Sequence, residues 1–386
     1  MLILGIITGL IILVLLVVLH ELGHGIVARR NGVVVEEFGV GFPPKAWAKK
    51  VKSSVLGKNV LFSVNWLPLG GFVKLKGEYD AADEKGGYGA AGYWVKTKIL
   101  LAGVLVNWLT AVLLLSALSL SGIPKILDDQ FTIPADTQVI REPLQVAYVG
   151  PDSPAAQAGL KVGDKLLRFN GAEVANPTEL TRLTAAHKGE QVELIYNRGG
   201  IEYEVKATLK AENSNDKGYL GVSTQQREKL RATWSAPIVG VVSTVQFTGA
   251  TLAGTGQVAW NALTGFVQSL SFDTNAREAG QKELATVGNS VAGPIGILGI
   301  IFPQAQAAGL EQLIFLTAII SLSLAVMNIL PIPALDGGRW FTMTLFRLLK
   351  KPLSKEREEK IQTAGFLVLM ALVLLVTWAD VGKLFR

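Results

Sequence analysis

Three polar side chains lie together near the end of a long apolar stretch at the start of the chain. In LLVVLHELGHGIVARR, residues 15 to 30, His20, Glu21 and His24 follow a run from residue 2 to residue 19 that holds no charge. Ionisable side chains cost free energy inside a bilayer, so those that occur there usually serve a function. This stretch is therefore the first candidate for a functional site.

The spacing of these residues suits metal chemistry. Residues four apart lie on one face of a helix, so His20 and His24 can bind the same ion. Glu21, beside the first histidine, can take a proton from a water molecule, which completes the HExxH pattern of zinc metalloproteases. The alternative without a function is a chance match at the end of an anchor helix. It would leave three polar side chains in or near lipid with no partner to offset the cost. His187, the third histidine of the chain, is expected to be a solvated residue at a helix end.

A zinc site needs a third protein ligand and an open position for water. The chain has no cysteine, so that ligand must be His, Asp or Glu. Asp336 is the candidate, because it follows the break in NILPIPALDGG, residues 328 to 338. Pro331 and Pro333 cannot continue a regular helix, and the two glycines after Asp336 allow a sharp turn. The alternative is that Asp336 only caps the next helix.

Asn328 lies one turn before this break. Its amide could donate to an oxyanion in a reaction or bind the backbone of a substrate. It could equally make a hydrogen bond between two helices, as Asn commonly does in membranes. The residue types alone leave both readings open.

The elements that must position these residues are predicted to be membrane helices. Of the 386 residues, 49% are hydrophobic and only 18% are charged, whereas soluble domains carry about 25% charge. Long apolar stretches predict four transmembrane helices. The net charge of +6 is modest, and we expect no nucleic-acid partner. The four stretches comprise residues 2–19, 99–121, 311–330 and 362–378.

Basic loops indicate the orientation of these helices. Residues 29–98 and the segment KKPLSKEREEK are basic, which places both in the cytoplasm. The N-terminus and residues 122–310 are then outside, and the candidate ligands lie towards the cytoplasmic face. Residues 236–260 are also uncharged and long enough to cross, but a crossing there would reverse the basic loops. We therefore interpret 236–272 as interfacial or extracytoplasmic.

The expected organisation has five parts. Short strands and two helices predict a small α+β domain at 143–226. Residues 1–121 contain the first two membrane helices and a loop on the cytoplasmic side, and residues 122–142 form a linker. Residues 227–310 form an extracytoplasmic or interfacial helical region. Residues 311–386 contain the last two membrane helices.

Several motifs together resemble the site-2 protease family of intramembrane zinc metalloproteases, in its bacterial form with a PDZ insertion. HELGH and NILPIPALDGG match the two signatures of that family. VEEFGVGFPPKAW, VAGPIGI and SVNWLPLGGFVKLKGE resemble further family segments, the last a membrane-dipping β-hairpin. LLAGVLVN differs, because Val104 replaces a proline of the family pattern, although Asn107 is kept. The chain also has room for one PDZ domain where many relatives have two.

The resemblance implies a polytopic α-helical membrane protein with four transmembrane helices, a membrane-associated β-hairpin and an inserted α+β PDZ domain. It implies one Zn²⁺ per chain held by His20, His24 and Asp336, with Glu21 as the general base. It also implies substrate-binding residues at Asn328, Pro331, Pro333, Gly70 and Gly71. YLGV would form the PDZ peptide groove, through Tyr219, Leu220, Gly221 and Val222, although this domain could instead filter substrates by size.

The function implied is an intramembrane endopeptidase of the bacterial cytoplasmic (inner) membrane. Its partners would be the lipid bilayer and single-span membrane proteins already trimmed outside, such as anti-sigma factors or signal-peptide remnants. Peptide termini could bind at the PDZ domain. One alternative is a catalytically silent PDZ membrane adaptor, which the presence of Glu21 with three candidate ligands disfavours. A transporter would need polar sites spread over several spans, and the second and fourth are nearly free of them.

Overall fold

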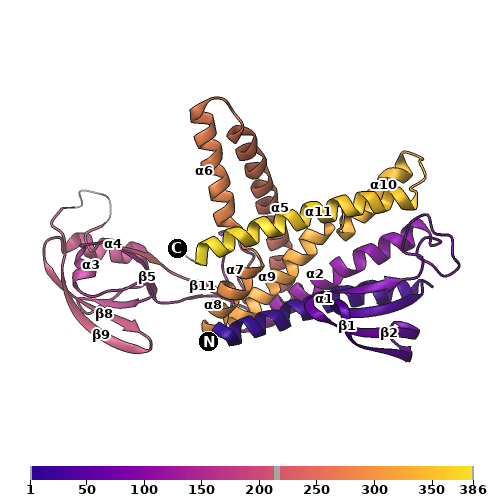
Figure 1. Ribbon diagram of the computed structural model, residues 1–386. Helices are drawn as coiled ribbons and strands as arrows, with labels where there is room; N and C mark the ends of the chain where they lie inside the picture. The colour runs from indigo at the N-terminus through magenta and orange to yellow at the C-terminus, as the bar shows by residue number, and fades with distance from the viewer. Residues whose placement is uncertain (1, 213–217, 385–386) are drawn as a thin grey trace. The chain divides into compact units, whose positions relative to one another are not determined.

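The computed structural model describes residues 2–212 and 218–384. The chain forms two compact units, of which the first combines residues 1–118 with 237–386 and the second is Ser119–Ala236. The first unit is built mainly of long helices with a β-hairpin at one end (Figure 1). The second unit is built mainly of strands.

Within the described residues, five helices are long and apolar enough to cross a membrane. The protein is therefore a multi-pass membrane protein. Four of these helices contain the apolar stretches predicted from the sequence, and α5 is a further candidate, so the count of four spans stays a prediction. The five are α1 (Leu2–Arg30), α2 (Tyr93–Ser121), α5 (Ala236–Ser269), α9 (Leu310–Ile329) and α11 (Lys355–Leu384).

Helix α5 divides into two halves with different surroundings. In the first half, Val239 and Phe247 are buried, and Trp108 of α2 donates from Nε1 to Thr248 Oγ1 over 3.2 Å. The second half forms a helical hairpin with α6 (Thr274–Ser290) that projects from the bundle (Figure 1). Gly280 of α6 lies so close to this half that an added Cβ would stand 2.6 Å from the Gly265 carbonyl oxygen. The first half of α5 is therefore part of the helix bundle.

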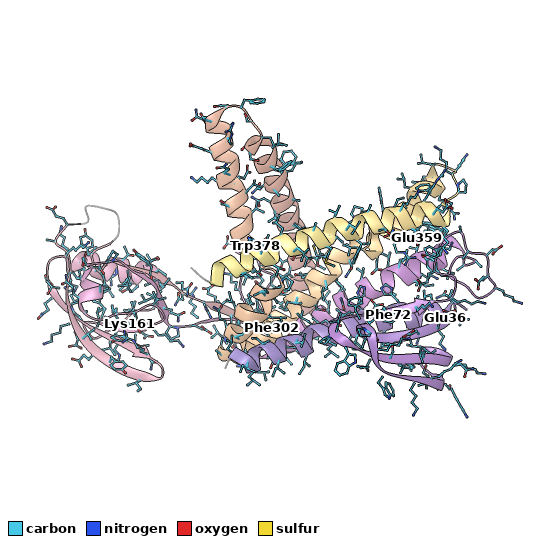
Figure 2. All side chains as sticks on the ribbon, in the orientation of Figure 1. Glu36, Phe72, Lys161, Phe302, Glu359 and Trp378 are labelled. Carbon is cyan, nitrogen blue, oxygen red and sulfur yellow. The ribbon has the colours of Figure 1, made fainter. Side chains whose placement is uncertain are left out.

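Short helices connect α6 to α9. They are α7 (Pro294–Gly296), the π-helix Ile297–Ile301 and α8 (Phe302–Ala307). Phe302, labelled in Figure 2, is fully buried. It packs onto α1, where an added Cβ at Gly9 would stand 2.6 Å from its ring. The start of α1 is thus held by α8, through a glycine that permits close approach.

The predicted β-hairpin consists of two long bent strands, β1 (Val35–Ser54) and β2 (Gly57–Leu75). Because both strands bend, the segment Val35–Val40 pairs with Leu61–Val64 and also with Gly71–Leu75. The last segment of β2 is consequently an edge of this small sheet. Apolar side chains from the hairpin, α1 and α2 form one core, which includes Ala28, Leu56, Val60 and Ile99.

The described residues of the second unit form two sheets and two short helices. The larger sheet has the strand order β10-β5-β6-β8-β9, with β7 beside β6, and the smaller sheet has the order β3-β11-β4. Ser153 and Asn176 cap the helices, and each is followed by proline. The predicted domain at 143–226 lies within this unit. The strands are β3 (Ile123–Pro124), β4 (Gln138–Arg141), β5 (Leu144–Val149), β6 (Lys165–Phe169), β7 (Ala172–Glu173), β8 (Gln191–Arg198), β9 (Ile201–Thr208), β10 (Val222–Gln225) and β11 (Glu228–Arg231), and the helices are α3 (Pro154–Gln157) and α4 (Pro177–Ala186).

One carboxylate anchors the end of this second unit. Asp136 accepts hydrogen bonds from the backbone amides of Thr233 and Ser235 and from both hydroxyl groups. These bonds, those from the Ser235 and Thr233 hydroxyl groups above all, hold the pKa of the Asp136 carboxyl at about 2. The carboxylate is therefore charged at neutral pH and fixes the residues directly before α5.

The contact between α5 and α2 depends on Gly240, because an added Cβ would stand 2.6 Å from the Ser116 backbone nitrogen. We expect Gly240→Ala to lower the midpoint of thermal unfolding in detergent, by the equivalent of about 1–3 kcal/mol for an overpacked contact. Gly249→Ala on the same helix is the control, because its Cβ would meet nothing within 4 Å. Equal midpoints for the two variants would show that this contact is not close-packed.

Candidate metal centre

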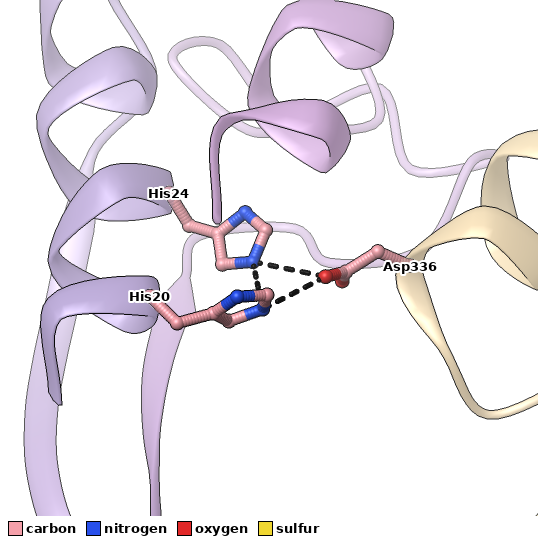
Figure 3. A group of neighbouring side chains, drawn as sticks. All are labelled: His20, His24 and Asp336. Atoms are coloured by element: carbon pink, nitrogen blue, oxygen red, sulfur yellow. Dashed lines mark hydrogen bonds and ion pairs between the residues drawn. The ribbon is translucent and has the colours of Figure 1, made fainter. Parts of the chain in front are cut away.

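Three side chains from distant parts of the chain meet inside the first unit (Figure 3). His20 and His24 point from adjacent turns of α1 towards Asp336, which is the first residue of α10 (Asp336–Leu348). Asp336 Oδ2 lies 3.0 Å from His20 Nε2 and 3.2 Å from His24 Nε2. The two Nε2 atoms are 3.1 Å apart. The two histidines predicted from HELGH and the aspartate predicted from ALDGG therefore lie together.

This triangle of donor atoms has the size of a zinc site. Zinc binds imidazole nitrogen and carboxylate oxygen at about 2.0–2.1 Å in tetrahedral geometry, which places neighbouring donors about 3.3 Å apart. The three observed separations, 3.0, 3.1 and 3.2 Å, are close to this value. The three residues are also the one group of His, Cys, Asp and Glu among the described residues whose donor atoms could hold a metal ion. The donor set fits zinc.

The second nitrogen of each imidazole is held by a partner on α2. His24 Nδ1 lies 2.7 Å from the backbone carbonyl oxygen of Ile99. A carbonyl only accepts, so Nδ1 carries the proton and Nε2 presents its lone pair to the metal position. Such partners of the outer nitrogen orient ligand histidines in metal sites. Ile99 could not be predicted from its residue type, because the acceptor belongs to the backbone.

The side-chain amide of Asn107 lies beside His20, with Asn107 Nδ2 3.4 Å from His20 Nδ1. The Asn107 Oδ1 atom is buried and has no hydrogen-bond partner among the described residues. If His20 binds metal through Nε2, its Nδ1 carries a proton that needs an acceptor. If the Asn107 amide is turned so that Oδ1 faces His20 Nδ1, Oδ1 accepts this proton and both buried atoms gain a hydrogen bond. Ser321 of α9 donates to the Asn107 backbone oxygen over 2.8 Å, which links α9 to this shell.

Gly103 of α2 leaves the space in which the two imidazoles lie. A Cβ at this position would stand 2.5 Å from His24 Nε2 and 2.6 Å from His20 Nε2. Any other side chain would therefore collide with both donor atoms. Sequence reasoning missed this residue, since a glycine in an apolar helix does not reveal which side chain it faces.

Glu21 lies beside this group and contacts the edge of the hairpin. Its Oε2 accepts a hydrogen bond of 3.0 Å from the Val73 amide in the last segment of β2. Gly71 is also near, since an added Cβ there would stand 3.6 Å from Glu21 Cγ. A cavity of about 440 Å³ is lined by Glu21, His24, Asp336 and the hairpin residues Phe72 and Val73. The arrangement joins a carboxylate, a possible metal position and a strand edge in one space.

The segment between α9 and α10 brings Asp336 to its position. Helix α9 ends before the two prolines, and Ala334 adopts a φ of +76°. Gly337 and Gly338 then let α10 start against this segment, because a Cβ at either would stand 2.2 Å or less from a carbonyl oxygen of Ile329 or Ile332. The predicted break is therefore present, but the two glycines do not form the turn. Both lie in α10 and are required by close contact.

Other predicted site residues lie in different surroundings. Asn328 donates from Nδ2 to the Leu324 carbonyl oxygen of its own helix, over 2.9 Å. Gly70 has a φ of +84° and lies against Phe42. Substrate binding stays a prediction for Gly70, and also for Asn328, Pro331 and Pro333. His187 is paired with Glu190 over 2.7 Å in the second unit.

The predicted peptide groove belongs to the second unit. Ala155 N donates to the Leu220 carbonyl oxygen over 3.1 Å, and Gly150 N donates to that of Gly221 over 2.9 Å. Gly221 has a φ of +75°. Strand β10, which begins at Val222, lies at one end of its sheet order. Tyr219, Leu220, Gly221 and Val222 thus form a loop that leads into an edge strand.

Comparison with known proteins agrees with this geometry. The family model for peptidase family M50 matches residues 8–372. The chain belongs to this family. The resemblance to the site-2 protease family is therefore confirmed, and the protein is a zinc metalloprotease of the site-2 type.

Individual relatives match along nearly the whole chain. A protein of Clostridium perfringens, whose name assigns it provisionally to the zinc metalloproteases, is 30% identical over 95% of this chain and 95% of its own length. The regulator of sigma-W protease RasP of Bacillus subtilis is 24% identical over 98% of this chain and 99% of its own. A solved structure of a PDZ domain from an SdrC-like protein of Listeria monocytogenes is 25% identical to this chain. The match covers 21% of this chain and 86% of that domain, and the TM-score is 0.19.

The space at Gly103 provides a direct test of the centre. We expect Gly103→Ala to lose most of its bound zinc, because the added methyl would occupy the space of the two Nε2 atoms. Zinc per chain is measured by mass spectrometry on purified protein. Gly92→Ala, just before α2, is the control, because its Cβ would meet nothing within 4 Å. Full zinc content in Gly103→Ala would contradict the described packing.

Proposed function

We propose that the protein is a zinc-dependent intramembrane endopeptidase in which His20, His24 and Asp336 hold one zinc ion and Glu21 is the general base. The observation that carries this proposal is the triangle of Nε2, Nε2 and Oδ2 atoms with sides of 3.0–3.2 Å. Zinc, when bound, lowers the pKa of water and polarises a carbonyl group. The residues of the chain supply the donors, the base and the space.

Glu21 is the one carboxylate that shares the cavity with two of the proposed ligands and neighbours His20 in sequence. Its role is to take a proton from water and then pass it to the nitrogen of the broken peptide bond. The Val73 amide fixes one carboxylate oxygen, Oε2. The other oxygen is then available for the proton transfer.

The strand edge beside Glu21 supports a way of holding the substrate. A transmembrane helix hides its peptide groups in its own hydrogen bonds, so a substrate must unwind before it can be cut. The segment Gly71–Leu75 pairs with β1 on one side only. An unwound substrate could add to its other side as a strand, which would replace the hydrogen bonds lost from the helix.

The proposed substrates are single-span membrane proteins whose outer parts have been removed, such as anti-sigma factors or signal-peptide remnants. The name of the Bacillus subtilis relative refers to regulation of sigma-W, which supports the first class. The proposed orientation has the N-terminus outside and the metal centre towards the cytoplasmic face. The second unit would then lie outside, as a PDZ domain that binds peptide termini or excludes untrimmed substrates.

A silent PDZ adaptor is the remaining alternative. It requires neither a base nor a third donor, yet the chain brings His20, His24, Glu21 and Asp336 into one place. A protein without catalysis would have no use for a carboxylate beside a metal position. The enzyme is therefore the better account.

The role of Glu21 is tested by Glu21→Gln. We expect zinc content to be unchanged and cleavage of a transmembrane reporter to fall about 10²–10⁴-fold, the usual contribution of general acid–base catalysis. Glu36→Gln is the matched control, because Glu36 is an exposed carboxylate on β1. Cleavage by Glu21→Gln at the rate of the wild type would refute the assignment.

The hydrogen bond between the strand edge and the proposed base is tested at Val73, whose amide donates to Glu21 Oε2. We expect Val73→Pro, which removes this N–H, to slow cleavage at least about fivefold, the equivalent of one net hydrogen bond. Val73→Ala keeps this N–H and serves as the control, and zinc content reports that both variants are folded. If the two variants cleave the reporter equally, the action of Glu21 does not depend on this hydrogen bond.

A further inference from the structure

A second cavity, of about 330 Å³, opens between the start of α2 and the end of α10. It is separate from the metal centre, as none of its lining residues is a proposed ligand or the proposed base. Three cationic side chains line it, together with one carboxylate, Asp80. The cations are Lys96, Arg347 and Lys351.

Two of these cations have no carboxylate partner among the described residues. Lys96 Nζ is paired with Asp80 Oδ1 over 2.5 Å, which balances the one negative charge of the wall. Arg347 and Lys351 have no ion pair with an acidic group within residues 2–212 and 218–384. The cavity therefore has an excess of two positive charges, which suits an anionic ligand.

The guanidinium of Arg347 is already oriented. Its central carbon lies 4.7 Å from the centre of the Tyr93 ring, and the Tyr93 hydroxyl lies 3.1 Å from Thr344 Oγ1 on α10. A guanidinium that stacks on an aromatic ring keeps its N–H groups at the edge free for a planar or tetrahedral oxyanion. Phosphate is the anion that such a fork and a neighbouring ammonium group commonly bind.

Exposed apolar side chains adjoin the lining residues. Trp94 is 73% exposed, Leu348 is 75% exposed and Leu349 is 56% exposed, and they neighbour Tyr93 and Arg347 in sequence. Tyrosine and tryptophan are typical of the depth where a membrane helix meets lipid headgroups. A basic cavity beside apolar side chains at the end of a candidate span matches a phosphate joined to hydrocarbon chains.

We propose that this cavity binds the phosphate of an anionic phospholipid, with its acyl chains along Trp94 and Leu348. The phosphate bridges α2, through Lys96, and the end of α10, through Arg347 on the helix and Lys351 directly after it. The same two helices contribute to the metal centre, α2 through Gly103 and α10 through Asp336. Asp336 lies eleven residues before Arg347. Binding therefore stabilises the helix pair that encloses the metal; this consequence rests on the proposed function, whereas lipid binding itself does not.

The test measures binding of phosphatidylglycerol to the full-length, zinc-loaded protein in detergent micelles. Phosphatidylcholine and inorganic phosphate are measured in parallel. We expect phosphatidylglycerol to bind and to raise the midpoint of thermal unfolding, and the double variant Arg347→Gln/Lys351→Gln to bind it about 30-fold more weakly, as expected for two lost cations. Arg347→Lys keeps the positive charge but loses the forked guanidinium, so its affinity for phosphatidylglycerol is expected to lie between those of the wild type and the double variant.

The matched control is Lys49→Gln/Lys50→Gln, which removes two exposed cations of β1 and should leave binding unchanged. Equal weakening in both double variants would overturn the proposal, because it would reveal diffuse attraction to anionic lipid. Equal binding of phosphatidylcholine, or the same stabilisation by inorganic phosphate, would overturn it as well. Glu21→Gln protein should bind the lipid as the wild type does, so a failure of the protease assignment is distinguishable from a failure of this one.

Discussion

The structure depends on the meeting of two segments that lie 316 positions apart in the chain. His20 on α1 and Asp336 at the start of α10 approach to 3.0 Å, and without this contact the Asp336 carboxylate would lose its two imidazole partners. A buried polar or charged group costs free energy unless it is paired or bound to a metal. The helices must therefore pack so that these side chains share one small space. The surrounding elements hold α1 and α10 in that arrangement.

Helix α2 also packs against the two imidazoles. It contributes empty space at Gly103, the Ile99 carbonyl oxygen that accepts from His24 Nδ1, and the Asn107 side-chain amide beside His20 Nδ1. A network of charges at the end of the bundle holds α10 in place as well. Arg339 donates to the Glu78 carbonyl oxygen over 2.7 Å, and Glu358 of α11 pairs with Arg339 and accepts from the Asp80 amide. The position of Asp336 thus depends on contacts with α2, α11 and the loop after the hairpin.

Much of the site could be predicted because ionisable groups in apolar stretches are rare and carry a clear signal. HELGH has helical spacing, and Asp336 follows a proline break at the end of an apolar stretch, so both were candidates before any fold was known. The groups that complete the site were less visible. Gly103 acts by lacking a side chain, Ile99 acts through its backbone, and the meeting of Val73 with Glu21 depends on a bend in β2. Residues 236–272 were interpreted as interfacial or extracytoplasmic because a crossing there would reverse the basic loops. That argument does not reveal the close contact between α5 and α2, which Gly240 permits.

In the proposed site, one zinc ion is held by two imidazoles and one carboxylate. X-ray absorption at the zinc edge of the purified, zinc-loaded protein tests it directly, because imidazole ligands give a distinct scattering pattern. We predict two imidazole nitrogens and oxygen ligands at about 2.0–2.1 Å. A first shell with three imidazoles would require His187, which lies in the other unit and pairs with Glu190. That result, or a shell with fewer than two imidazoles, would contradict the account.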